Sequence, residues 1–255
     1  MEDKNPNVHV TLTSNDPLLL KAKKLLDETR AAILALINHI FTGKGLKKEF
    51  LPFLVILFRM GQTVSSLELL LYAKLERDAA TLMLTLMELR YDALYMAADL
   101  RRTQEWLDHD KENKKPWGVT YLIQQLYKNK NECDAELGLY RKCSMKKHGN
   151  PFGGTETFPL GVENGWIVFL PSKFDPKMVA TYLLWGCSEC ETVARTAIET
   201  FDTEGIDVKE FKQQFEGINR LRSIMTEVNI KEHLVELLKC QANNATEADN
   251  SANNE

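Results

Sequence analysis

The chain has 255 residues, of which 44% are apolar, and carries a formal net charge of −4 with a pI near 5.8. This length and apolar content are enough for one large domain or two small ones, each with a hydrophobic core. The slight acidity argues against a protein that coats nucleic acid by bulk attraction. Any binding of anions would therefore have to depend on a local group of basic side chains.

The sequence also predicts a cellular location. The longest apolar run, Leu51 to Phe58, stops at Arg59 and is shorter than the roughly 18–20 residues of a membrane span. The first residues are polar and acidic, which does not fit a secretory signal. Five cysteines at irregular spacing are typical of reduced thiols rather than of a disulfide framework. We therefore expect a cytoplasmic protein that does not bind membranes.

Helical periodicity dominates the chain and predicts an all-α fold. Asp16-Pro17 and Asp175-Pro176 each combine an N-cap residue with a proline in the first turn, so we expect a helix to begin at each pair. Gly149-Asn150-Pro151 is a strong stop signal for the helix before it. The pattern gives six or seven helices, at about 16–42, 47–74, 76–98, 100–111, 117–148, 175–201 and 207–238. The helix at 117–148 is either continuous or interrupted around Asn129 to Asn131.

The only convincing β signal lies between the helices predicted at 117–148 and 175–201. Thr157 to Val162 and Trp166 to Leu170 flank Asn164-Gly165, which is a preferred pair for a tight hairpin turn. We therefore predict a β-hairpin at about 157–170 inside a single helical domain that spans 16–240. Residues 1–15 are expected to form an N-terminal arm. The polar residues 241–255 are expected to be a disordered tail.

The helix predicted at 76–98 is apolar nearly all round, which is typical of a helix packed on several sides. A polar stripe interrupts it, because Thr81, Thr85, Glu88 and Asp92 follow one another at spacings of four, three and four. This stripe is either the solvent face or a polar wall inside the bundle. In the second case Glu88 would need a cationic partner, and we expect it within reach of Arg141 or His148.

The segment Tyr140 to Pro151 holds the densest group of chemically capable side chains in the sequence. On a helix at about 100° per residue, Arg141, Ser144 and His148 fall within about 60° of one another and share a face. The members of the group are Arg141, Lys142, Ser144, Lys146, Lys147 and His148. A guanidinium, a hydroxyl and an imidazole would then project together from one helix end.

Two resemblances follow from these residues. Arg141 and His148 form an Arg-x6-His pair that resembles the Arg-x4-6-His motif of HEPN domains, all-helical domains found in many prokaryotic toxins and defence ribonucleases. The run from about Leu46 to Phe201 also resembles a family of uncharacterised bacterial helical proteins. In that family a Glu-bearing central helix precedes a Tyr-x3-Ser-x3-His-Gly segment, here Tyr140, Ser144, His148 and Gly149.

The HEPN resemblance implies a metal-independent ribonuclease that works as a homodimer in a toxin or defence role. Arg141 and His148 would be catalytic, and Ser144, Lys146, Lys147 and Glu88 would contact the RNA. An imidazole suits the removal of the 2′-hydroxyl proton at neutral pH, and a guanidinium suits the negative charge at phosphorus. The second resemblance implies no activity. It leaves open a non-catalytic helical protein that binds an unknown protein partner.

The sequence predicts neither a cofactor nor a metal. Cys187 and Cys190 form a CxxC, but both lie on or beside the apolar stripe of a helix, where cysteine behaves as a small hydrophobic residue. A structural zinc site needs four ligands, and no second CxxC or HxxxH is present. The Walker A, G-x-G-x-x-G and G-x-S-x-G signatures are missing as well.

Overall fold

The computed structural model describes residues 15–43, 47–112, 116–147, 160–163, 166–169 and 175–228. These residues are helical except for two short strands and the connections, so the predicted all-α class is confirmed. The predicted tail at 241–255 and all but the last residue of the predicted arm at 1–15 lie outside them. The elements are α1 (Pro17–Thr42), the 3-10 turn η1 (Lys48–Phe50), α2 (Leu51–Tyr72), α3 (Glu76–Ala97), α4 (Arg102–Glu112), α5 (Val119–Leu126), α6 (Lys130–Lys147), β1 (Leu160–Glu163), β2 (Trp166–Phe169), α8 (Pro176–Thr203) and a helix over residues 209–228.

The described residues thus contain eight α-helices, one more than the upper end of the predicted number. The difference arises at residues 117–148, where the sequence left open an interruption around 129–131 and the structure has one between Leu126 and Lys130. Tyr127 has an extended backbone there, and the Asn129 side chain accepts a hydrogen bond from the backbone N–H of Asn131 at 2.9 Å. This is an N-cap contact that starts a new helix, so the segment divides into α5 and α6.

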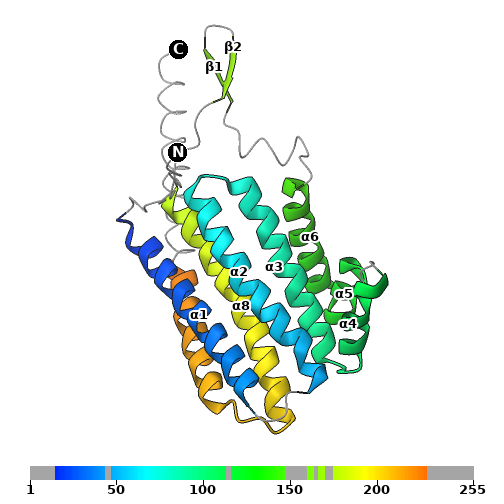
Figure 1. Cartoon of the computed structure of the whole chain (residues 1–255). Helices are drawn as coiled ribbons and strands as arrows, with labels where there is room; N and C mark the ends of the chain where they lie inside the picture. The colour runs from blue at the N-terminus through cyan, green and yellow to red at the C-terminus, as the bar shows by residue number, and fades with distance from the viewer. Residues whose placement is uncertain are drawn as a thin grey trace, which may run out of the picture.

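Four long helices, α1, α2, α3 and α8, form a bundle that contains most of the core (Figure 1). Both predicted helix starts are confirmed. The side chain of Asp16 accepts from the backbone N–H of Leu19 at 2.9 Å, and that of Asp175 accepts from Lys177 at 2.9 Å. The helices approach closely at Gly186 of α8, where an added Cβ would lie 3.2 Å from a Leu67 side-chain carbon of α2.

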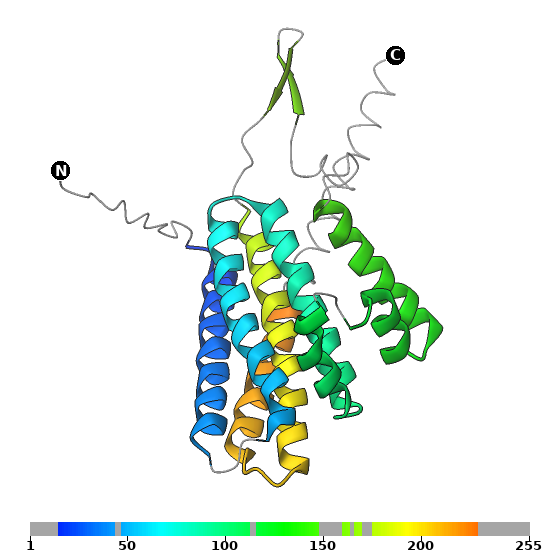
Figure 2. The same cartoon turned by 45° about the vertical axis from the view of Figure 1, so that its right-hand side comes forward.

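A second layer lies on the outer side of α3. Helices α4, α5 and α6 all pack against α3, and in Figure 2 they stand on the side of the bundle away from α1. The helix over 209–228 packs on the other side: Phe211 contacts His39 of α1, with ring centroids 5.1 Å apart, and Arg222 contacts Glu191 of α8. The strands β1 and β2 pair in antiparallel fashion, from Leu160 opposite Phe169 to Glu163 opposite Trp166.

One sequence-based expectation needs correction. The helix over Lys48–Tyr72 is long and apolar enough to cross a membrane, by length and composition alone. Arg59 interrupts the apolar run, but a second apolar stretch follows it in the same helix as far as Tyr72. Core helices meet the same criterion, and α2 packs against α1, α3 and α8.

Candidate functional site

The basic group lies at the C-terminal end of α6. Arg141 and Lys142 are exposed, and Ser144, one turn further on, is half-buried. Arg141 makes no hydrogen bond or ion pair with another residue that the structure describes. Its guanidinium is therefore available to a ligand. The side chains of Lys146 and Lys147, and all of His148 and Gly149, lie outside the described residues, so the predicted Arg141–His148 pair stays a prediction.

Glu88 has a partner on α6, but it is the residue before Arg141. The Tyr140 hydroxyl donates a hydrogen bond to Oε1 of Glu88 at 2.9 Å. Burial raises the pKa of Tyr140, and the hydrogen bond to Glu88 raises it further. The expected contact between Glu88 and Arg141 is not formed, because Arg141 points to solvent while Tyr140 faces α3. The contact between Glu88 and His148 stays a prediction.

The polar stripe on α3 is an interior wall. Its four members are all half-buried: Thr81, Thr85, Glu88 and Asp92. Two of them, Glu88 and Asp92, accept hydrogen bonds from residues of the outer layer. The Asp92 carboxylate accepts from the indole N–H of Trp106 in α4 at 3.3 Å and from that of Trp117, before α5, at 2.9 Å. Of the two interpretations of the stripe, the structure therefore supports the second. Glu88 and Asp92 help to attach α4–α6 to α3.

Replacing Asp92 by asparagine is expected to lower the free energy of unfolding by about 1–2 kcal/mol. The amide keeps one acceptor oxygen, but its NH₂ group then faces an indole N–H. Both indoles are 8% exposed, so water does not readily replace the lost acceptor. Urea denaturation followed by tryptophan fluorescence measures the change. Asp202→Asn, on an exposed position of α8, is the control and is expected to have almost no effect.

A cluster of charged side chains joins α3, α6 and α8, and sequence reasoning missed it. Arg90 of α3 pairs with Glu136 of α6, and its Nε lies 3.0 Å from Oε2 of Glu189 in α8. The Tyr91 hydroxyl donates to Glu136 at 2.7 Å, and the Trp185 indole donates to Glu189 at 2.8 Å. The available signal was a charged residue among the apolar residues of a helix, Arg90 in α3 and Glu189 in α8.

The electrostatics of this cluster follow from its burial. Glu189 is only 3% exposed, so desolvation raises the pKa of its carboxyl group, while Arg90 opposes that rise. Burial by itself would lower the pKa of Arg90, but Glu189, Tyr127 and Glu136 more than offset it, and the pKa is raised. Arg90 thus stays charged and neutralises carboxylates on two different helices.

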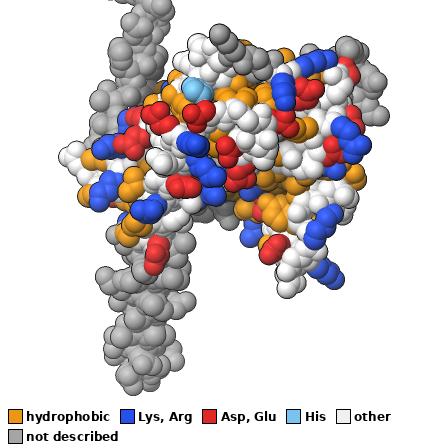
Figure 3. All heavy atoms as spheres, turned by 90° about the horizontal axis from the view of Figure 1, so that it is seen from below, with side chains coloured by type: hydrophobic (Ala, Val, Ile, Leu, Met, Phe, Trp, Pro, Cys, Tyr) orange, Lys and Arg blue, Asp and Glu red, His pale blue; other side chains and the backbone are white. Residues whose placement is uncertain are grey.

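A pocket of about 350 Å³ opens at the opposite end of the bundle, where α8 stops. Lys47 pairs there with Glu204, and Lys48 donates to the Gln104 side chain at 2.7 Å. Figure 3 views this end and shows acidic and basic side chains interleaved. Lys47 also lies near the C-terminal end of α8, because Glu204 is the C-cap residue of that helix, and the helix dipole there favours a cation. We therefore interpret these lysines as structural, and the pocket does not adjoin Arg141.

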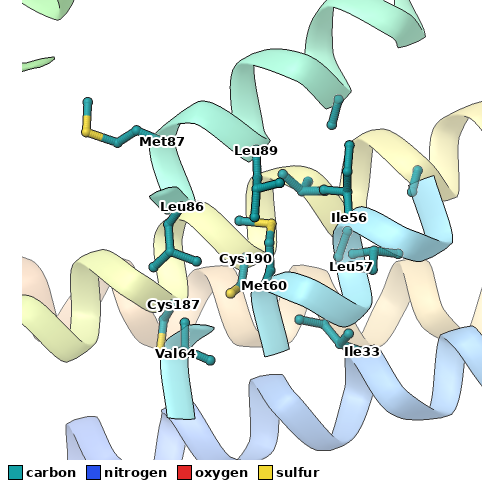
Figure 4. Packing of buried hydrophobic residues seen from close by; sticks show 14 of the residues in the cluster. Ile33, Ile56, Leu57, Met60, Val64, Leu86, Met87, Leu89, Cys187 and Cys190 are labelled. Atoms are coloured by element: carbon teal, nitrogen blue, oxygen red, sulfur yellow. The ribbon is translucent and has the colours of Figure 1, made fainter. Parts of the chain in front are cut away.

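The two cysteines of the CxxC lie in the core. Figure 4 places the side chains of Cys187 and Cys190 among apolar residues of the bundle, including Met60 and Val64, and both thiols are 0% exposed. Burial raises the pKa of Cys187 to about 12 and that of Cys190 well above its ordinary value. Among the described residues, no group of three or more His, Cys, Asp or Glu side chains is arranged to hold a metal ion.

Comparison with known proteins identifies no relative. No protein-family model matches the chain, and no curated protein and no solved structure is significantly similar to it. The case for a function therefore depends on the residues described above. These are an exposed guanidinium at the end of α6 and a polar interface that fixes this helix on α3.

Proposed function

We propose that the protein is a HEPN-like, metal-independent ribonuclease that acts in the cytoplasm as a homodimer, in a toxin or defence role. The observation that carries the proposal is the exposed Arg141 guanidinium, which has no ion-pair partner among the described residues. A phosphate group can bind it without displacing an internal carboxylate. The anchoring of α6 by Tyr140 and Glu136 supports the proposal further, because it fixes the helix that carries Arg141.

Each proposed side chain has one role. His148 removes the proton of the RNA 2′-hydroxyl, which attacks the adjacent phosphorus and forms a cyclic phosphate as the 5′-oxygen leaves. Arg141 stabilises the negative charge that develops on the phosphoryl oxygens. Lys146 and Lys147 hold the flanking phosphates, and Ser144 contacts the backbone of the substrate. The sequence suggested that Glu88 contacts the substrate. We assign it an anchoring role instead, because it accepts the hydrogen bond of the Tyr140 hydroxyl.

The dimer is part of the proposal because one helix supplies a single Arg-His pair. Helix α6 lies at the edge of the molecule opposite α1 (Figure 1), so a second copy has access to it. In the proposed dimer the two α6 helices face one another across a cleft that holds the RNA. Arg141 of each copy then contributes to one composite site.

The test is the incubation of purified protein with single-stranded RNA in excess EDTA. Cleavage is expected from the unaltered protein, and a loss of at least about 100-fold is expected for Arg141→Ala and for His148→Ala. Arg59→Ala is the matched control, because Arg59 is also an exposed arginine on a helix. It removes the same charge and is expected to leave the rate unchanged. Activity that survives in His148→Ala, or no cleavage of any RNA, would contradict the ribonuclease.

A second candidate function is a non-catalytic helical protein that binds a protein partner. It is favoured by the large apolar side chains that α1 and α2 expose: Leu34 (50%), Phe41 (55%), Phe58 (49%) and Leu69 (58%). Such side chains mark an interaction surface where they form one contiguous patch. The absence of RNA cleavage together with unchanged folding of Arg141→Ala would support this candidate.

A further inference from the structure

Helix α6 is attached to the rest of the protein differently from the helices of the bundle. It packs on α3 and on α5. In the part of α6 whose side chains are described, only two apolar residues are buried, Leu137 (9% exposed) and Cys143 (7%). Helix α8, by contrast, buries apolar side chains along its whole length. Apolar burial therefore holds α6 much less strongly than it holds α8.

Polar contacts supply much of the remaining attachment, at two levels one turn apart. Glu136 pairs with Arg90 and accepts the hydrogen bond of the Tyr91 hydroxyl at 2.7 Å. One turn later, Tyr140 donates to Glu88 at 2.9 Å. Both sets of groups are half-buried on the α6 side, so water can take over these hydrogen bonds when the helices separate.

The charges in this interface are arranged so that α6 can leave without stranding a buried ion. Arg90 contacts two carboxylates, and one of them, Glu189, belongs to α8. If α6 moves away, Glu136 enters water, whereas Arg90 and Glu189 remain together as a neutral pair. A buried charge that loses its only partner is strongly destabilising, and this arrangement avoids that effect.

We propose that α6 is a reversibly docked arm, which separates from α3 while the bundle of α1, α2, α3 and α8 stays folded. Such sub-global openings occur where an element has few buried apolar contacts. The inference goes beyond the proposed function and does not depend on it. It does bear on that function, since the docked state fixes where Arg141 lies relative to the bundle.

The cysteines provide built-in reporters of this opening. Cys143 lies on α6 and is covered when the helix is docked, whereas Cys187 and Cys190 lie in α8 inside the bundle. Of these three cysteines, undocking exposes only Cys143, whereas global unfolding exposes all three. The full chain is treated under native conditions with iodoacetamide, and the rate of alkylation at each cysteine is measured by peptide mass spectrometry.

Cys143 is expected to react at least about tenfold faster than Cys187 and Cys190. Glu136→Ala is expected to accelerate the alkylation of Cys143 about tenfold more and to leave Cys187 and Cys190 unchanged. Asp134→Ala is the control, since Asp134 is an exposed acidic residue of the same helix. It is expected to change none of the three rates.

Equal rates at the three cysteines would overturn the proposal, and so would a Glu136→Ala variant that accelerates all three equally. Either result would make α6 part of the global folding unit. Tyr140→Phe is the second variant, for use if circular dichroism shows that Glu136→Ala does not fold. It removes only the hydroxyl that contacts Glu88. It is expected to accelerate the alkylation of Cys143 about threefold without changing that of Cys187. If Tyr140→Phe does not selectively accelerate the alkylation of Cys143, the proposal is overturned.

Discussion

Replacing Arg90 by methionine is expected to lower the free energy of unfolding by about 3–5 kcal/mol. Methionine keeps much of the volume of the side chain but leaves two carboxylates without their cation. Glu189 is the costly one, because it is 3% exposed and, among the described residues, keeps only the Trp185 indole as a hydrogen-bond donor. Glu136 still has the Tyr91 hydroxyl and lies nearer to water. Urea denaturation followed by circular dichroism measures the loss.

The loss is also expected to depend on pH. Burial already raises the pKa of Glu189, and removing Arg90 takes away the main opposing effect. In the variant the folded state therefore keeps its proton at a pH where the unfolded chain has lost it. The free energy of unfolding then falls as the pH rises above the ordinary pKa of glutamate. As the pH is lowered from 7 to about 5, the difference in free energy of unfolding between Arg90→Met and the unaltered protein is expected to shrink.

Two further variants decide whether the stranded charge is the cause. Arg90→Met combined with Glu189→Leu is expected to recover most of the loss, because the buried carboxylate is gone. Arg195→Met is the matched control: Arg195 pairs with Glu191, but it is 45% exposed, and Glu191 keeps Arg222. That variant is expected to cost less than about 1 kcal/mol. An equal loss for Arg90→Met and Arg195→Met, or a loss independent of pH, would contradict our account.

The helices of the bundle could be predicted because their signals are local. Asp16-Pro17 and Asp175-Pro176 specify a cap and a first turn within a few residues, and the structure has both. The sequence left the break between α5 and α6 only as an alternative, around Asn129 to Asn131, because the segment contains no proline or glycine at that point. An extended backbone at Tyr127 and a single asparagine cap are enough to end one helix and begin another. Such a break does not disturb the periodicity on either side.

The residues of the candidate site also differ in whether local sequence is enough to predict them. Arg141 is at the end of a helix and has an exposed side chain, and both features follow from residues close to it in the sequence. The cluster around Arg90 joins residues from three helices, and Glu136 lies 46 positions away along the chain. Each of these charges on its own fits a solvent-exposed position. Only the packing of α6 and α8 against α3 shows that they are internal, which one sequence does not specify.

Replacing Phe201 by alanine is expected to destabilise the protein by about 3–5 kcal/mol, without any change in charge. Phe201 is 0% exposed near the end of α8, and its ring contacts that of Phe50 in η1, with centroids 5.1 Å apart, and that of Phe53 in α2, at 6.2 Å. Truncation leaves a cavity among these rings, and their close-packed surroundings relax only partly to fill it.

Urea denaturation compares this variant with Phe58→Ala, which removes the same side chain from a position that is 49% exposed and is expected to cost less than about 1 kcal/mol. The difference between the two variants measures the contribution of burial alone. Because the cavity lies in the bundle, Phe201→Ala is also expected to accelerate alkylation at Cys187 and Cys143 together, unlike Glu136→Ala. A similar loss of stability in both phenylalanine variants would contradict the packing of α8 against η1 and α2 described above.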